Sequence, residues 1–124
     1  MKKSLLTLFA TTSALTSNAS IDDIEIYFFW LTNYGYTCSV SDSIITQLVK
    51  QDLPTVKYEV VNLDEQPSSD FIKDTNYQEK VVVILNKKTG YYQESSIREL
   101  IYYQTPVEDI KDKFIQEITQ VLSK

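Results

Sequence analysis

An almost unbroken apolar run near the start of the chain, residues 24–31 with the sequence IEIYFFWL, constrains the fold most. β-branched and aromatic residues fill this run, and only Glu25 interrupts it. A strand with one solvated face alternates apolar and polar residues, whereas a strand buried on both faces of a sheet has a nearly continuous apolar sequence. We therefore expect a central strand here, followed by a loop over residues 32–37 that contains Asn33 and Gly35.

A helix is predicted directly after this loop. Between residues 39 and 51 the apolar side chains recur at helical spacing, and Asp42 suits the positive end of the helix dipole. Cys38, the only cysteine, stands where this helix is expected to begin. Unpaired backbone N–H groups and the dipole at a helix start both favour a thiolate over a thiol. The sequence thus predicts a reactive thiol, although Cys38 could equally be a small apolar residue with no chemistry.

Two further strands and a hairpin are expected in the middle of the chain. Residues 56–60 alternate apolar and polar side chains, which is typical of a strand, and residues 80–85, KVVVIL, predict an internal one. A turn over residues 86–90 should place Gly90 at a positive φ and return the chain as an antiparallel strand over residues 91–94.

Helices complete the predicted fold. Short ones are expected over residues 70–77, packed through Phe71 and Ile72, and over residues 96–102. The last helix should begin at Thr105 as its cap, with Pro106 in the first turn and an apolar face made of Val107, Ile110, Phe114, Ile118 and Val121. The fold class predicted is therefore α/β, with a central mixed four-stranded sheet flanked by helices.

Composition excludes several classes of function. At 124 residues with 43% hydrophobic residues, the chain can build one core. Its net charge of −5, without a basic patch, gives no support for nucleic acid or an anionic membrane as a partner. Histidine is absent, and a single cysteine allows neither an internal disulfide nor a thiolate zinc cluster. We expect no metal and no cofactor.

Residues 1–19, MKKSLLTLFATTSALTSNA, have the pattern of a secretory signal peptide. Two lysines precede a short apolar region, and small residues end the segment at Ala19. The apolar region is too short for a comfortable membrane span, so no stable span is expected after processing. Threonines dilute it, and an amphipathic N-terminal helix is the alternative. We expect cleavage after Ala19, a domain over residues 20–124, and a periplasmic or extracellular location.

Three stretches resemble the thioredoxin-like superfamily. Phe29-Trp30 before the cysteine-headed helix is similar to the strand end and tryptophan before a thioredoxin redox loop. Residues 61–67, VNLDEQP, resemble the segment in which a strand ends in an aspartate followed by an acidic or polar residue and a proline. Residues 81–90, VVVILNKKTG, resemble the apolar strand and lysine-glycine hairpin. The resemblance covers residues 23–122 and looks closest to small exported bacterial thioredoxin-like proteins.

The resemblance implies site residues and also marks departures. Cys38 and Ser41 fall on the positions of the paired redox cysteines, so this Cys-x-x-Ser motif lacks the resolving thiol. The seven-residue loop 31–37 is longer than usual, and Glu79, Lys80 and Val81 occupy the region of the cis-proline before the third strand. The candidate binding residues are Trp30, Tyr34, Tyr36, Lys80 and Val81. For Tyr34 and Tyr36, covering the core is the simpler interpretation.

Two hypotheses about function follow. In the first, an exported thioredoxin-like protein carries out monothiol thiol–disulfide exchange, or captures partners as mixed disulfides, through Cys38. Its partners would be protein thiols or disulfides, or a small-molecule thiol, and a disulfide-linked homodimer is a variant. In the second, the chain is a redox-inactive binding or structural module of the cell envelope. Two aromatic doublets, Tyr91-Tyr92 and Tyr102-Tyr103, either pack or form an interaction surface.

Overall fold

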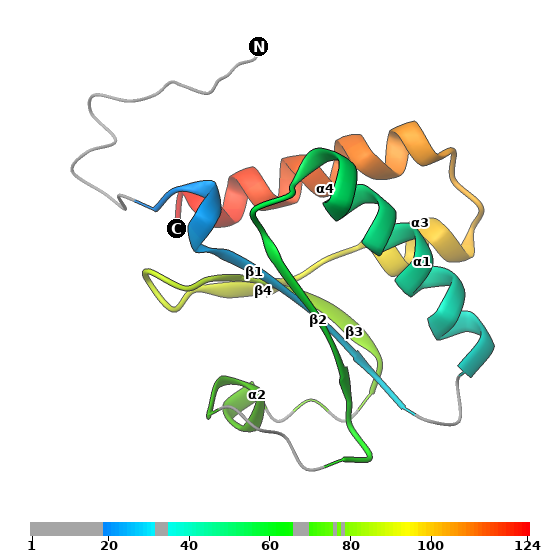
Figure 1. The fold of residues 1–124 in the computed structure, drawn as a ribbon, viewed down its shortest axis with the longest axis horizontal. Coiled ribbons are helices and arrows are strands. Elements are labelled where there is room, and N and C mark those ends of the chain that lie inside the picture. Colours follow the sequence, from blue (N-terminus) through cyan, green and yellow to red (C-terminus); the bar gives the residue numbers. More distant parts are fainter. Residues whose placement is uncertain (1–18, 32–34, 66–69, 76, 78) are drawn as a thin grey trace.

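The computed structural model describes residues 19–31, 35–65, 70–75, 77 and 79–124. Figure 1 shows helices and a twisted sheet in the order that the sequence predicts. A 3-10 turn at Ile21–Asp23 precedes the first strand. The elements that follow are β1 (Ile24–Trp30), α1 (Gly35–Asp52), β2 (Lys57–Asn62), α2 (Asp70–Thr75), β3 (Val81–Asn86), β4 (Tyr92–Glu94), α3 (Ile97–Tyr102) and α4 (Val107–Leu122).

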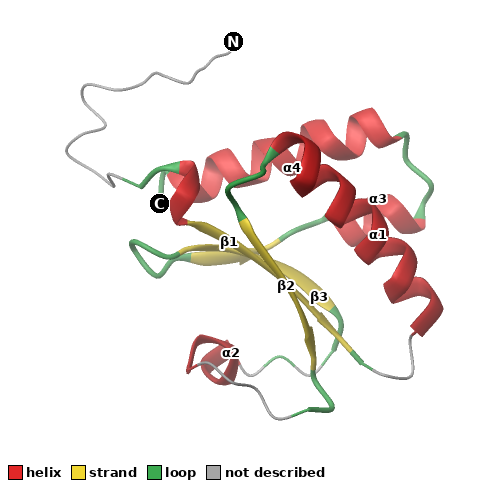
Figure 2. Cartoon of the chain, viewed as in Figure 1, coloured by secondary structure: helices red, strands yellow, loops and turns green. Residues whose placement is uncertain are grey.

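The described strands form a mixed four-stranded sheet in the order β2-β1-β3-β4, which confirms the predicted fold class (Figure 2). β1 runs parallel to β2, with Phe28 opposite Val60, and antiparallel to β3, with Phe28 opposite Val82. β3 also pairs antiparallel with β4. The two nearly continuous apolar runs are thus the two internal strands, as expected for strands buried on both faces.

β1 supplies both faces of the sheet. Ile24, Ile26 and Phe28 are fully buried in the main core with residues of α1, α3 and α4, and these helices lie on one side of the sheet in Figure 1. Tyr27 and Phe29 point to the other face, where Phe71 of α2 lies 5.2 Å from the Tyr27 ring centroid. Because successive strand residues point to opposite faces, one strand can anchor both layers.

The first helix begins earlier than predicted. α1 includes residues 35–37, so the predicted loop 32–37 is wrong at those three positions, while residues 32–34 lie outside the described residues. Glycine destabilises a helix mainly in its interior, and Gly35 is the first residue of α1. Cys38 therefore lies within the first turn of α1 and not at its cap.

The start of the last helix also differs from the prediction. Pro106 is the cap of α4, its carbonyl accepts the N–H groups of Asp109 and Ile110 at 3.0 Å, and Thr105 does not cap. Val107, predicted in the apolar face, is 55% exposed, because the buried stripe of α4 begins only at Ile110.

The predicted signal peptide falls almost wholly on residues 1–18, which lie outside the described part of the chain. Its predicted cleavage site follows Ala19, the first described residue. Of the helices that the structure describes, none has the length and apolar character that a bilayer crossing requires.

Candidate functional site

A hollow of about 390 Å³ opens between α1, the start of β3 and α3. A volume of this size is within the range of ligand pockets in proteins, about 300–1,000 Å³. We call it the basic hollow, because the described residues of its lining include two cations and no carboxylate. These residues are Val40, Ser41, Lys80, Arg98, Ile101, Tyr102 and Gln104.

α1 contributes Val40 and Ser41 to the basic hollow. Ser41 is only 6% exposed, whereas Val40 next to it is 38% exposed. Ser41 follows Cys38 by three residues in the helix. The backbone of Cys38 is part of α1, but its side chain lies outside the described residues.

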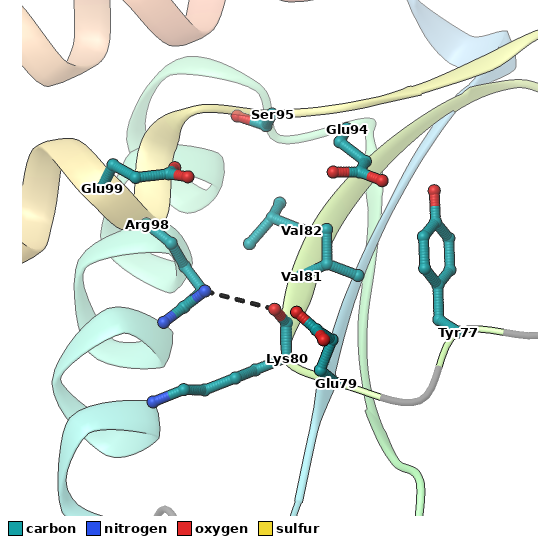
Figure 3. Close-up of a pocket in the computed structure, with 9 residues that line it drawn as sticks. All are labelled: Tyr77, Glu79, Lys80, Val81, Val82, Glu94, Ser95, Arg98 and Glu99. Carbon is teal, nitrogen blue, oxygen red and sulfur yellow. Dashed lines mark hydrogen bonds between the residues drawn. The ribbon is translucent and has the colours of Figure 1, made fainter.

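Arg98 ties α3 to the start of β3. Its Nη1 donates a hydrogen bond of 3.2 Å to the backbone carbonyl of Lys80, as Figure 3 shows. The side chain of Lys80 extends from the same point toward α1 in this view. Arg98 and Lys80 therefore bring two positive charges to one wall of the basic hollow.

A second hollow of about 520 Å³, drawn in Figure 3, shares this pair with the basic hollow. We call it the acidic hollow, because Glu79, Glu94 and Glu99 line it together with the shared Lys80 and Arg98. Its other lining residues are Tyr77, Val81, Val82 and Ser95. The two hollows thus adjoin at one cationic wall and differ in charge.

Tyr77 in the acidic hollow has a perturbed phenol. Burial, the charge of Glu94 and a hydrogen bond with that carboxylate together raise the pKa of Tyr77 to about 12. Figure 3 shows the two side chains facing each other. This phenol stays neutral at physiological pH, so it can donate a hydrogen bond but offers no negative charge.

Glu117 of α4 holds the start of α3 in place. This carboxylate is 6% exposed and accepts the Ser95 hydroxyl at 2.5 Å, the Ser96 hydroxyl at 2.7 Å and the Ser96 N–H at 3.0 Å. The Ser95 oxygen in turn accepts the N–H of Ile97, the first residue of α3, at 3.0 Å. The buried Glu117 carboxylate therefore holds the two serines that precede α3, and α3 is the element that carries Arg98 and Tyr102.

The structure brings together some of the residues singled out from the sequence. Ser41 and Lys80 line the basic hollow, while Val81 lines the acidic one. Trp30 lines neither described hollow; its ring packs at 5.8 Å, edge to face, on Phe28 beside the main core. Tyr34 and the side chain of Tyr36 lie outside the described residues.

Sequence reasoning missed Arg98, Ile101 and Glu117. Arg98 is the only arginine of the chain, which was the one available signal. The Tyr102-Tyr103 doublet is not packed in the core: the two side chains are 72% and 74% exposed, and their rings contact each other edge to face at 5.2 Å. The structure thus favours the surface interpretation for this doublet.

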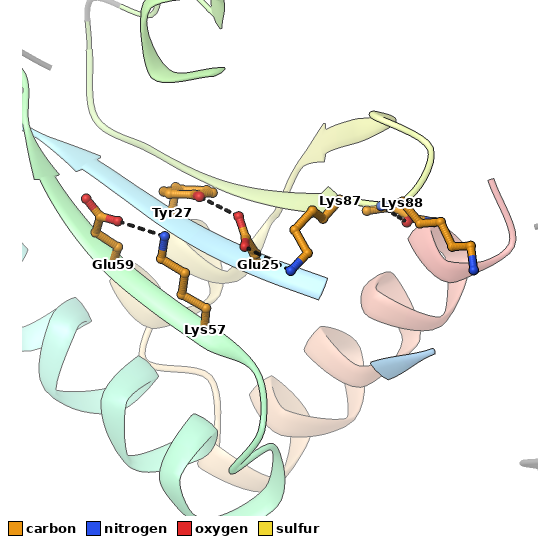
Figure 4. Close-up of polar contacts among 7 residues, drawn as sticks. Glu25, Tyr27, Lys57, Glu59, Lys87 and Lys88 are labelled. Carbon is orange, nitrogen blue, oxygen red and sulfur yellow. Dashed lines mark hydrogen bonds and ion pairs between the residues drawn. The ribbon is translucent and has the colours of Figure 1, made fainter. Parts of the chain in front are cut away.

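A separate polar cluster lies on the sheet away from both hollows (Figure 4). Glu25 accepts the Tyr27 hydroxyl at 2.5 Å and lies 3.8 Å from Lys87, while Lys57 pairs with Glu59 at 3.4 Å. Burial, the hydrogen bond to Glu25 and nearby carboxylate charges hold the pKa of Tyr27 well above its ordinary value. Within the described ranges, no three His, Cys, Asp or Glu side chains are grouped to hold a metal ion.

No protein-family model and no curated protein matches the chain. In contrast, 11 chains of solved structures match. Chloroplastic thioredoxin z is similar over 73% of this chain and 80% of its own, with 19% identity and a TM-score of 0.47. A malarial protein is similar over 67% of this chain and 98% of its own, with 17% identity and a TM-score of 0.42. The described part of the chain is a mixed four-stranded sheet with flanking helices.

Proposed function

We propose that this thioredoxin-fold chain captures partner proteins through Cys38 as a monothiol, by forming a mixed disulfide. The observation that carries the proposal is the basic hollow, which is lined by Val40 and Ser41 of α1, the helix that contains Cys38. Ser41, one turn further along the helix, lines this hollow with Lys80 and Arg98. Cations and a helix N-terminus are the surroundings that lower the pKa of a thiol.

The proposed reaction is thiol–disulfide exchange. The Cys38 thiolate attacks one sulfur of a partner disulfide, a new Cys38–sulfur bond forms, and the old disulfide breaks. The second partner sulfur leaves as a thiolate and takes a proton from water. No net oxidation occurs in this step, because one disulfide replaces another.

Ser41 occupies the place where a resolving thiol would stand, and a hydroxyl cannot attack the mixed disulfide to form a new one. A second thiol, from a small molecule or another protein, must therefore release the partner. If its thiolate attacks the partner sulfur, Cys38 leaves directly as a thiolate and the partner keeps a disulfide with the second thiol. If it attacks the Cys38 sulfur, the partner leaves as a thiolate, and a further equivalent of thiol must reduce the new Cys38 disulfide. The mixed disulfide should persist when no such thiol is present.

Titration of the thiol tests this proposal directly, because the chain has one cysteine and every modification reports on it. The rate of alkylation should follow a pKa below the free value of about 8.5. Lys80→Gln should raise that pKa, whereas Lys88→Gln, on the distant β3–β4 turn, should leave it unchanged. A pKa at or above the free value in the unmodified chain would refute the proposal.

The alternative function is a redox-inactive binding module of the cell envelope. The observation that favours it is the exposed Tyr102 at the edge of the basic hollow, whose described lining residues could bind a ligand without a thiol. Cys38→Ala decides between the two: loss of cellular function in a folded variant supports capture, and full function supports the binding module. A reducible dimer band on a non-reducing gel would instead identify a Cys38-linked homodimer.

Export is part of the proposal. Removal of residues 1–19 would deliver the domain, residues 20–124, to an oxidising compartment, where partner disulfides are present. Sequencing the N-terminus of the protein recovered from cells tests this point. A mature chain that begins at Ser20 supports it, and a chain that begins at Met1 in the cytoplasm contradicts it.

A further inference from the structure

We propose that the two hollows together bind an extended segment of a partner polypeptide that carries an acidic residue next to an apolar one, with a basic residue further along. The acidic and apolar side chains would occupy the basic hollow, and the basic side chain would occupy the acidic hollow. This inference goes beyond the proposed function, because the binding requires no reaction of Cys38.

Charge is the first reason. The chain as a whole carries a net charge of −5, yet the lining of the basic hollow has Lys80 and Arg98 and no carboxylate. A guanidinium has five N–H donors, and Arg98 uses Nη1 on the Lys80 carbonyl. That contact fixes the orientation of the side chain, so a carboxylate entering the hollow would meet a preorganised donor group.

The apolar part of the same lining is the second reason. Tyr102 is 72% exposed and Val40 is 38% exposed, and both border the hollow beside the half-buried Ile101. The edge-to-face contact with Tyr103 restrains the Tyr102 ring. An exposed aromatic side chain next to aliphatic ones is typical of interface residues that a partner buries.

The acidic hollow explains why the occupant should be a polypeptide of mixed charge. It shares Lys80 and Arg98 with the basic hollow, so one ligand can pass from one to the other over this wall. Glu79, Glu94 and Glu99 are exposed in its lining and would repel a purely anionic ligand that extended past the wall. A chain with an acidic residue and, a few positions away, a basic residue complements the linings of both hollows.

Fluorescence anisotropy with labelled decapeptides tests the proposal. The probe peptide has an aspartate-phenylalanine pair and a lysine three residues later in an alanine-serine background, and a second peptide exchanges the two charges. The protein is the Cys38→Ser variant, so disulfide formation cannot contribute to the signal. Failure here would therefore leave the thiol titration of the proposed function untouched.

We expect the probe peptide to bind at least about fivefold more tightly than the exchanged peptide at low salt. Lys80→Glu should weaken the probe about tenfold, as should Tyr102→Ala if this ring is a central contact. Two controls should stay within about twofold: Lys88→Glu, which makes the same charge change on the β3–β4 turn, and Val107→Ala, which truncates an exposed apolar side chain outside the lining. Circular dichroism confirms that each variant is folded.

Three outcomes overturn the proposal: equal affinity for the two peptides, equal losses in Lys80→Glu and Lys88→Glu, or competition by free glutamate as strong as that by the peptide. The last result would identify a small-anion site. Exchanging the charges on both sides provides a further test. The Lys80→Glu variant should bind a peptide whose aspartate is replaced by lysine more tightly than it binds the probe peptide. Absence of that gain also counts against the assignment.

Discussion

Substitution of Glu117 tests how the start of α3, a helix that lines the basic hollow, is stabilised. Its buried carboxylate accepts three hydrogen bonds from Ser95 and Ser96, which lie 22 and 21 residues earlier in the chain. Replacing Glu117 by alanine leaves two hydroxyls and one backbone N–H without this acceptor. We expect the free energy of unfolding to fall substantially.

The magnitude follows from the geometry. Hydrogen bonds to a charged group contribute about 1.5–3 kcal/mol each, which would suggest more than 4 kcal/mol for three. The carboxylate also loses solvation on burial, and the two hydroxyls can rotate toward other acceptors, so the net loss should be smaller. We expect about 3 kcal/mol for Glu117→Ala. Glu117→Gln keeps one carbonyl oxygen as an acceptor and should lose about half as much.

Urea unfolding followed by the fluorescence of Trp30 measures this loss. With a typical urea dependence of about 2 kcal/mol per molar, Glu117→Ala should lower the midpoint by about 1.5 M. Gln116→Ala, at an exposed position of the same helix, is the control and should shift the midpoint by less than about 0.3 M. A Glu117→Ala midpoint as close to wild type as that of the control would refute the reasoning.

A second readout locates the effect. Because Glu117 holds Ser95 and Ser96 directly before α3, its loss should speed amide hydrogen exchange in Ile97–Tyr102 more than in the rest of α4. Peptide binding in the basic hollow should weaken too, since α3 carries Arg98 and Tyr102. Uniform faster exchange over the whole chain would indicate a general loss of stability and not a role in positioning α3.

Three further predictions test the turn, the core and the buried phenols. Gly90→Ala should cost about 1 kcal/mol in urea unfolding, because Gly90 has a φ of 83° although an added Cβ would meet no atom within 4 Å; Gly90→Asn should cost less. Phe114→Ala should cost about 3–5 kcal/mol by the same measurement, since the side chain is 1% exposed, and a loss below about 1 kcal/mol would mean that the core is not packed as described. The free energy of unfolding should fall as the pH rises from 10.0, the ordinary pKa of tyrosine, to about 12, because the folded chain keeps the Tyr77 proton that the unfolded chain releases. Tyr77→Phe should make this fall less steep, and an unchanged pH profile in that variant would contradict the raised pKa of Tyr77.

The sequence alone determined the local elements. Two nearly continuous apolar runs became the internal strands β1 and β3, and Gly90 has the positive φ expected for the hairpin turn. Apolar spacing also predicted α1 and the buried face of α4 from Ile110 onward. These features depend on neighbouring residues and on which side of an element is apolar, and both are visible in a linear sequence.

Only the tertiary structure decided which polar groups meet. Arg98 bonds to the carbonyl of Lys80, 18 residues earlier in the sequence, and Glu117 bonds to Ser95, 22 residues earlier. No local sequence pattern predicts either contact. The exposure of Val107 and of the Tyr102-Tyr103 doublet was also decided by where α3 and α4 dock on the sheet. Apolar burial is non-directional and can be predicted from periodicity, whereas a hydrogen bond needs two groups at a fixed distance and angle, and this geometry exists only after the sheet and helices have packed.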